Sequence, residues 1–141
     1  MGDANRELGC LRVKMDGKDE QRYVLYCEDD NEVQQEISEI LNDELKPCKV
    51  VAAASLEEAI KKATPIINSI RCVITDGKLG NESCGWDVAE KLKSLGYNGT
   101  IVYCGTTALP EDKRHFFSCS MNKVAIGRKS MLDILKDYIN Q

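Results

Sequence analysis

The sequence predicts an α/β fold in which a five-stranded parallel sheet is covered by helices on both faces. From Arg22 onward, short apolar runs alternate with longer amphipathic stretches, and five such runs occur. The runs are continuously apolar, which is typical of strands that are buried on both faces. Strands and helices that alternate along a chain favour a parallel sheet with right-handed crossovers.

Each predicted strand is an apolar run bounded by polar residues. The five runs are Tyr23–Cys27, Lys49–Ala53, Cys72–Thr75, Thr100–Cys104 and Lys123–Ile126. Between the runs, apolar residues recur every three or four positions, as Val33, Ile37 and Leu41 do. This spacing predicts helices that each bury one face against the sheet.

Local signals mark where the predicted helices begin. Ser55, with Glu58 three residues later, forms a capping box before the second helix. Pro110, followed by Glu111 and Asp112, suits the first turn of a fourth helix, because proline lacks an N–H group that would be unused there. These signals agree with a chain built from five strand–helix units.

Length and composition favour one globular domain that follows a short extension. The chain has 141 residues, of which 43% are hydrophobic and 30% are charged. Residues 1–21 show little periodicity, so we expect a flexible extension or linker there and a single domain over residues 22–141.

Several classes of function are disfavoured by the composition. A net charge of −4 argues against a nucleic-acid partner. The apolar runs are too short to cross a bilayer and the N-terminus lacks the apolar core of a signal peptide, so we expect a cytoplasmic protein without a membrane partner. The seven cysteines form no CxxC pair and the chain has one histidine, which disfavours a zinc site. An odd cysteine count without a secretory signal favours a reducing compartment.

Acidic residues follow two of the predicted strands. Glu28, Asp29 and Asp30 follow the first run, and Asp76 follows the third. Ligands of open α/β sheets bind at the carboxyl ends of the strands. If these two strands are neighbours, three or more carboxylates meet at one edge, which is costly unless a cation or proton lies among them. The pattern indicates a Mg²⁺-dependent phosphoryl-acceptor site. Neither GxGxxG nor GxxxxGK[ST] occurs, so nucleotide sites of those types are disfavoured.

Over roughly residues 22–140, the chain resembles the receiver domain of bacterial two-component response regulators. Glu28 and Asp29 match the acidic pair that this family carries after its first strand, and Asp76 in Cys-Val-Ile-Thr-Asp matches its phosphoacceptor. Gly85-Trp86-Asp87 resembles the glycine and helix opening downstream of the third strand. The resemblance implies a flavodoxin-like fold with strand order 2-1-3-4-5.

The resemblance also implies a function. Asp76 would take a phosphoryl group from a histidine kinase or histidine phosphotransfer protein, and thereby switch the binding of a downstream protein target or a detached output domain. Asp29 would bind Mg²⁺ directly and Glu28 through water, with Asp76 and the backbone carbonyl of Lys78 as further ligands. Such a domain phosphorylates itself and slowly dephosphorylates, so we do not expect a turnover enzyme.

Two positions depart from the family pattern. The family has Thr or Ser after the fourth strand, where this chain has Gly105, and a one-residue slip would bring the hydroxyl of Thr106 into place. The family has Lys-Pro after the fifth strand, whereas Ala-Ile-Gly-Arg-Lys-Ser contains no proline. Lys129 is our candidate for the phosphate contact, with Arg128 next. These departures motivate an alternative, a degenerate receiver that acts as a phosphorylation-independent protein-binding module.

Simpler interpretations stay open at this point. Asp29 and Asp30 can favour the positive end of the first helix, an aspartate after a strand is often a turn residue, and Lys129 can be a surface charge. A haloacid-dehalogenase-like phosphatase also uses an aspartate after a strand. That family needs a second aspartate two residues later as general acid, where this chain has Lys78.

Overall fold

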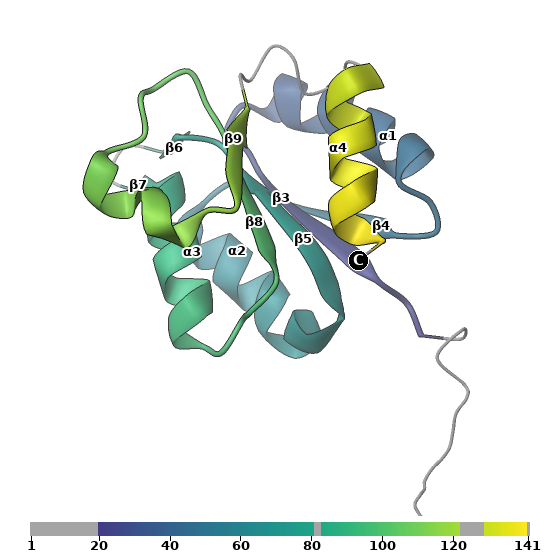
Figure 1. Cartoon of the computed structure of the whole chain (residues 1–141), viewed down its shortest axis with the longest axis horizontal. Helices are drawn as coiled ribbons and strands as arrows, with labels where there is room; N and C mark the ends of the chain where they lie inside the picture. Colours follow the sequence, from purple (N-terminus) through teal and green to yellow (C-terminus); the bar gives the residue numbers. More distant parts are fainter. Residues whose placement is uncertain (1–19, 81–82, 122–128, 141) are drawn as a thin grey trace, which may run out of the picture.

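The computed structural model describes residues 20–80, 83–121 and 129–140, and it has the α/β fold that the sequence predicts (Figure 1). The main sheet contains β3 (Tyr23–Cys27), β4 (Lys49–Ala53), β5 (Ile70–Thr75), β8 (Thr100–Cys104) and β9 (Cys119–Met121). The helices are α1 (Asn31–Glu44), α2 (Leu56–Ala63), α3 (Gly85–Ser94) and α4 (Lys129–Ile139), with two 3₁₀ helices, η2 (Thr64–Ser69) and η3 (Glu111–Phe116). A short antiparallel hairpin of β6 (Lys78–Leu79) and β7 (Ser83–Cys84) follows β5.

The five strands of the main sheet are parallel and lie in the order β4-β3-β5-β8-β9. Counted along the chain, this is the predicted order 2-1-3-4-5, so the flavodoxin-like fold is confirmed. β3 lies between β4 and β5, and its last residue, Cys27, pairs with Ala53 on one side and with Thr75 on the other. The carboxyl ends of these three strands therefore meet at one edge of the sheet.

Helices cover both faces of the sheet, with α1 and α4 on one face and α2 and α3 on the other (Figure 1). Successive side chains of a strand point to opposite faces. Tyr26 of β3 accordingly belongs to the same buried core as Leu135 of α4, whereas Leu25 belongs to the same core as Leu92 of α3. Burial on both faces explains why the strands are continuously apolar.

Side-chain caps fix the starts of α1 and α2. The carboxylate of Asp30 accepts hydrogen bonds from two backbone N–H groups in the first turn of α1. In the predicted capping box, the hydroxyl of Ser55 accepts from the N–H of Glu58 at 3.1 Å, and the Glu58 carboxylate accepts from the N–H of Ala54. The start of α2 is therefore where the sequence predicts it, and Asp30 fills the capping role that we left open.

Two predicted elements differ from the structure. The fifth strand of the sheet is β9, whereas the run predicted as that strand, Lys123–Ile126, lies outside the described residues. Cys119-Ser120-Met121 is short and its serine is exposed, so it lacks the continuous apolarity of a central strand. The helix predicted after Pro110 is the six-residue 3₁₀ helix η3. The β6–β7 hairpin has no counterpart among the predicted elements.

The predicted extension and the domain boundary stay predictions, because residues 1–19 lie outside the described residues. Among the helices of the described ranges, none combines the length and apolarity that crossing a bilayer requires.

Candidate metal centre at the carboxyl edge of the sheet

Glu28, Asp29 and Asp76 come together at the carboxyl edge of β3 and β5. Each offers one carboxylate oxygen, and these oxygens lie within 4.8 Å of one another. Glu28 is 1% exposed and Asp76 is 8% exposed, whereas Asp29 is open to solvent. Within the described residues, no other group of three or more Asp, Glu, His or Cys side chains lies as close together. The sequence therefore predicted this convergence of carboxylates correctly.

Backbone pairing that continues past the strand ends anchors these residues to the sheet. The N–H of Glu28 donates to the carbonyl of Ala53 at 2.9 Å, and the N–H of Asp76 donates to the carbonyl of Cys27 at 3.0 Å. The backbones of Glu28 and Asp76 are thus each hydrogen-bonded to the end of a neighbouring strand, which fixes where the two buried side chains begin. Groups that are held by strands are placed more accurately than groups carried on loops.

Backbone N–H groups of the chain after β5 orient two of the carboxylates. Oδ1 of Asp76 accepts from the N–H of Gly77 at 2.6 Å. Oδ2 of Asp29 accepts from the N–H of Gly80 at 3.0 Å, which joins residues 51 positions apart in sequence. These two bonds fix the orientation of the Asp76 and Asp29 carboxylates relative to the segment after β5.

Glu28 is held by its own neighbours on the chain. Its Oε2 accepts from the N–H of Asp30 at 3.1 Å, and the hydroxyl of Tyr26 lies 3.5 Å from its Oε1. Burial, together with the negative charge of Glu28, raises the pKa of Tyr26 far above its ordinary value of 10.0. The phenol therefore stays protonated and available as a donor to the carboxylate.

Gly85 has a steric role beside the cluster. A Cβ at this position would overlap the carbonyl oxygen of Asp76 and lie 2.9 Å from Oγ1 of Thr75. The N–H of Gly85 also donates to the carbonyl of Gly77 at 3.1 Å. α3 therefore begins directly against the backbone of Asp76, and only glycine permits that approach.

The other predicted site residues have exposed side chains. Lys78 opens β6 two residues after Asp76, and its side chain faces solvent, which leaves its backbone carbonyl as the predicted metal ligand. Thr106 lies in the loop after β8 and is exposed. Lys129 is the first residue of α4 and is also exposed, and Arg128 lies outside the described residues.

The register of the sheet identifies a residue that the sequence analysis missed. Thr75 pairs with Tyr103, so one residue further along Asp76 is level with Cys104, which is 3% exposed. A Cβ on Gly105 would lie 2.7 Å from the backbone nitrogen of Gly77, so that position has no room for a side chain. We aligned Gly105 with the hydroxyl residue of the family, but Cys104 is the residue beside Asp76. A cysteine that ends an apolar run looks like a core residue in the sequence.

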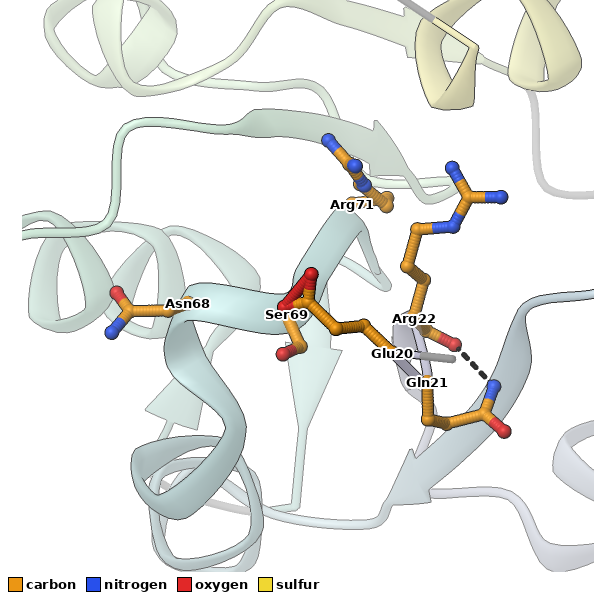
Figure 2. A pocket seen from close by; sticks show the side chains of 6 residues that line it. All are labelled: Glu20, Gln21, Arg22, Asn68, Ser69 and Arg71. Atoms are coloured by element: carbon orange, nitrogen blue, oxygen red, sulfur yellow. Dashed lines mark hydrogen bonds between the residues drawn. The ribbon is translucent and has the colours of Figure 1, made fainter. Parts of the chain in front are cut away.

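A hollow lies at the opposite, amino edge of the sheet (Figure 2). It is lined by Glu20, Gln21, Arg22, Asn68, Ser69 and Arg71. Arg22 directly precedes β3 and Arg71 lies near the start of β5. The one carboxylate in this lining belongs to Glu20, so the hollow does not offer a divalent cation the set of oxygen ligands found at the carboxyl edge.

No known family of sequences matches the chain, and no curated protein matches it in sequence. Solved receiver domains do match its fold. A response regulator receiver domain from Clostridium thermocellum superposes with a TM-score of 0.67 at 20% identity, over 84% of this chain and 91% of that chain. Chemotaxis protein CheY4 of Vibrio cholerae superposes with a TM-score of 0.70 at 20% identity, over 84% and 99% of the two chains. A CheY-like receiver domain from Methylobacillus flagellatus gives 0.71 at 15% identity, over 85% and 99%. The chain therefore has the receiver-domain fold that the sequence resemblance implies.

Proposed function

We propose that this chain is a phospho-accepting receiver domain of a two-component phosphorelay. Asp76 would receive the phosphoryl group of a phosphohistidine on a histidine kinase or histidine phosphotransfer protein. The observation that carries the proposal is the group of three carboxylates within 4.8 Å of one another, two of them buried, at the edge where α/β sheets bind their ligands. Like charges this close and this buried need a counter-charge.

The residues present fit Mg²⁺. The cluster offers oxygen donors, which this ion prefers, and it leaves coordination positions for water. Asp29 would hold the ion directly and Glu28 through water, and Asp76 and the backbone carbonyl of Lys78 would complete the protein ligands. When bound, the ion would offset the negative charge of the acceptor and of the incoming phosphoryl group.

Asp76 supplies the nucleophile in this proposal. One of its carboxylate oxygens attacks the phosphorus, a P–O bond forms as the P–N bond of the phosphohistidine breaks, and the imidazole leaves with the electron pair of that bond. The N–H of Gly77, 2.6 Å from Oδ1 of Asp76, holds the carboxylate in one orientation during the attack. The transfer is a single stoichiometric event, so we do not propose a turnover enzyme.

Two further roles belong to this proposal. Thr106, which is exposed in the loop after β8, would supply a hydroxyl to the phosphoryl group. Lys129 remains our candidate for the phosphate contact. Since the fifth strand ends at Met121, the first lysine that follows it in the sequence is Lys123, and we propose a comparison of Lys123→Ala with Lys129→Ala to assign the contact.

Phosphorylation would shift an existing equilibrium between two conformations and so switch the binding of a downstream protein target or a detached output domain in the cytoplasm. The alternative function is a degenerate receiver whose binding does not depend on phosphate. It is favoured by one observation, that a cysteine, Cys104, occupies the position level with Asp76 in the sheet register, because a thiol is a weaker hydrogen-bond donor than the hydroxyl that the family carries.

Incubation with acetyl phosphate and Mg²⁺, followed by intact-mass measurement, separates the two functions. We expect the wild type to gain the mass of one phosphoryl group and to gain none in the presence of EDTA. Asp76→Ala is expected to stay unlabelled, and Asp112→Ala, which changes an exposed aspartate of η3, is expected to label like the wild type. An unlabelled wild type, or equal labelling of Asp76→Ala, would favour the degenerate receiver.

A further inference from the structure

Tyr103 connects the loop after β8 to the residue that follows the acceptor. Its side chain is 3% exposed, and its hydroxyl donates to the backbone carbonyl of Thr107 at 2.5 Å. The loop that begins at Gly105 thus folds back over the phenol. A tyrosine hydroxyl that is buried in this way needs a partner, and the carbonyl of Thr107 provides one.

The backbone of Gly77 packs directly against this assembly. A Cβ on Gly77 would overlap the hydroxyl of Tyr103, and a Cβ on Gly105 would lie 2.7 Å from the nitrogen of Gly77 and 3.1 Å from the same hydroxyl. Gly77, Gly105 and the phenol are therefore packed so closely that neither glycine has room for a side chain. The nitrogen at this contact is the one whose N–H donates to Oδ1 of Asp76.

Aromatic neighbours restrict the ring of Tyr103. Phe117 packs edge-on against it, with ring centroids 5.3 Å apart, and Trp86 of α3 lies 6.4 Å away in a tilted arrangement. Burial, and after it the negative charge of Asp76, raises the pKa of Tyr103 above its ordinary value. The hydroxyl therefore remains a hydrogen-bond donor at neutral pH.

We propose that Tyr103 is a positioning residue for the acceptor, because its hydroxyl holds the segment of residues 105–107 against Gly77 and so fixes the Gly77 N–H on the carboxylate of Asp76. The inference rests on the proposed function in one respect, namely that the reactivity of Asp76 is what is positioned. The same contacts connect Asp76 to Trp86 through Gly77 and the ring of Tyr103, so a change of charge at Asp76 is expected to alter the surroundings of Trp86.

Tyr103→Phe is the direct test, with Tyr97→Phe as its matched control. Tyr97 is also buried, at 5% exposure, and its hydroxyl also binds backbone carbonyls, those of Ile70 and Thr100 at 3.3 and 3.4 Å. It lies near the amino edge, away from Asp76. Each variant loses one buried hydroxyl, so a general loss of stability affects both, whereas a positioning effect is confined to Tyr103.

The first measurement is amide hydrogen exchange of Gly77 by NMR, which requires no phosphorylation. In Tyr103→Phe we expect exchange about tenfold faster, as for the loss of one hydrogen bond, and in Tyr97→Phe we expect the wild-type rate. Gly105→Ala, which presses a methyl group onto the Gly77 nitrogen, is expected to accelerate the exchange as well and covers the case in which Tyr103→Phe does not fold. An unchanged Gly77 rate in the folded variants overturns the inference.

The second measurement is the rate of labelling by acetyl phosphate. We expect Tyr103→Phe to lower the maximal rate several-fold while the acetyl phosphate concentration at half-maximal rate stays the same, and Tyr97→Phe to change neither. Equal rates for Tyr103→Phe and the wild type contradict the positioning role. If the wild type itself is not labelled, the proposed function fails, and the exchange of Gly77 then decides the structural claim by itself.

Discussion

The two edges of the parallel sheet carry charge in opposite ways. At the carboxyl edge, Glu28 and Asp76 are buried, have the same sign and receive backbone N–H donors. At the amino edge, Arg22 and Arg71 share a hollow with the carboxylate of Glu20, and both Glu20 and Arg71 are open to solvent (Figure 2). Water screens mixed, exposed charges at little cost, whereas buried charges of one sign need a partner. The burial and close approach of the carboxylates, rather than the number of charges, distinguish the carboxyl edge as a candidate ligand site.

The largest expected difference between the edges is in Mg²⁺ affinity. Asp29→Ala removes a proposed direct ligand, and Arg71→Ala removes a charge at the amino edge. A lost ligand costs at least as much as a lost supporting hydrogen bond, so we expect Asp29→Ala to weaken Mg²⁺ binding by about 100-fold. We expect Arg71→Ala to bind like the wild type. Isothermal titration calorimetry measures both, and equal affinities of the two variants would remove the distinction between the edges.

The second difference concerns stability. Binding of Mg²⁺ to the folded state is expected to raise the free energy of unfolding by about 2.7 kcal/mol when the free ion is about 100-fold above its dissociation constant. Without the metal, Asp29→Asn is expected to stabilise the protein, because it relieves repulsion among the three carboxylates. Urea denaturation with and without Mg²⁺ checks both signs. A less stable Asn variant in EDTA would show that the carboxylates do not repel one another.

The residue beside Asp76 gives a third, smaller effect. Cys104→Thr restores a hydroxyl at the position level with the acceptor, and we expect the phosphorylated form to accumulate faster than in the wild type. Gly105→Thr places the same side chain one position later, where it meets the Gly77 backbone, and we expect a loss of about 1–3 kcal/mol of stability from overpacking. Labelling kinetics and thermal melting distinguish the two. A well-folded Gly105→Thr that labels faster would restore the original alignment.

The smallest effect concerns a carboxylate near the same edge that already has partners. The N–H of Ala54, followed by the Lys62 ammonium 3.2 Å away, lowers the pKa of Glu58 below its ordinary value of 4.5. Its contribution to stability is therefore present above the ordinary pKa and is lost as the pH falls through the lowered value. Glu58→Gln is expected to flatten the acid side of the stability curve slightly, as measured by urea denaturation over a pH series. An unchanged curve would show that these bonds do not stabilise the folded state.

The sequence predicted the parts of the site that depend on strand ends. Tyr23–Cys27 and Cys72–Thr75 are continuous apolar runs, so the sequence placed Glu28 and Asp76 at strand ends. That the two strands are neighbours followed from the strand order that the family resemblance implies. The place of Cys104 beside Asp76 depends on the register between β5 and β8, which a single run does not specify. The contact between Tyr103 and Gly77 likewise joins two segments that are far apart in the sequence, so the sequence alone did not predict it. β9 was missed because a short edge strand with an exposed serine lacks the pattern of a buried one.

The most direct test of the metal centre is anomalous diffraction from crystals grown with Mn²⁺ in place of Mg²⁺. Carboxylate oxygens bind both ions, and manganese gives a peak that marks its position without a fitted ligand. We predict the strongest peak between Glu28, Asp29 and Asp76. A strongest peak elsewhere, for instance over the exposed acidic side chains of α1 at Glu32 and Glu36, with none at the carboxyl edge, would contradict the account.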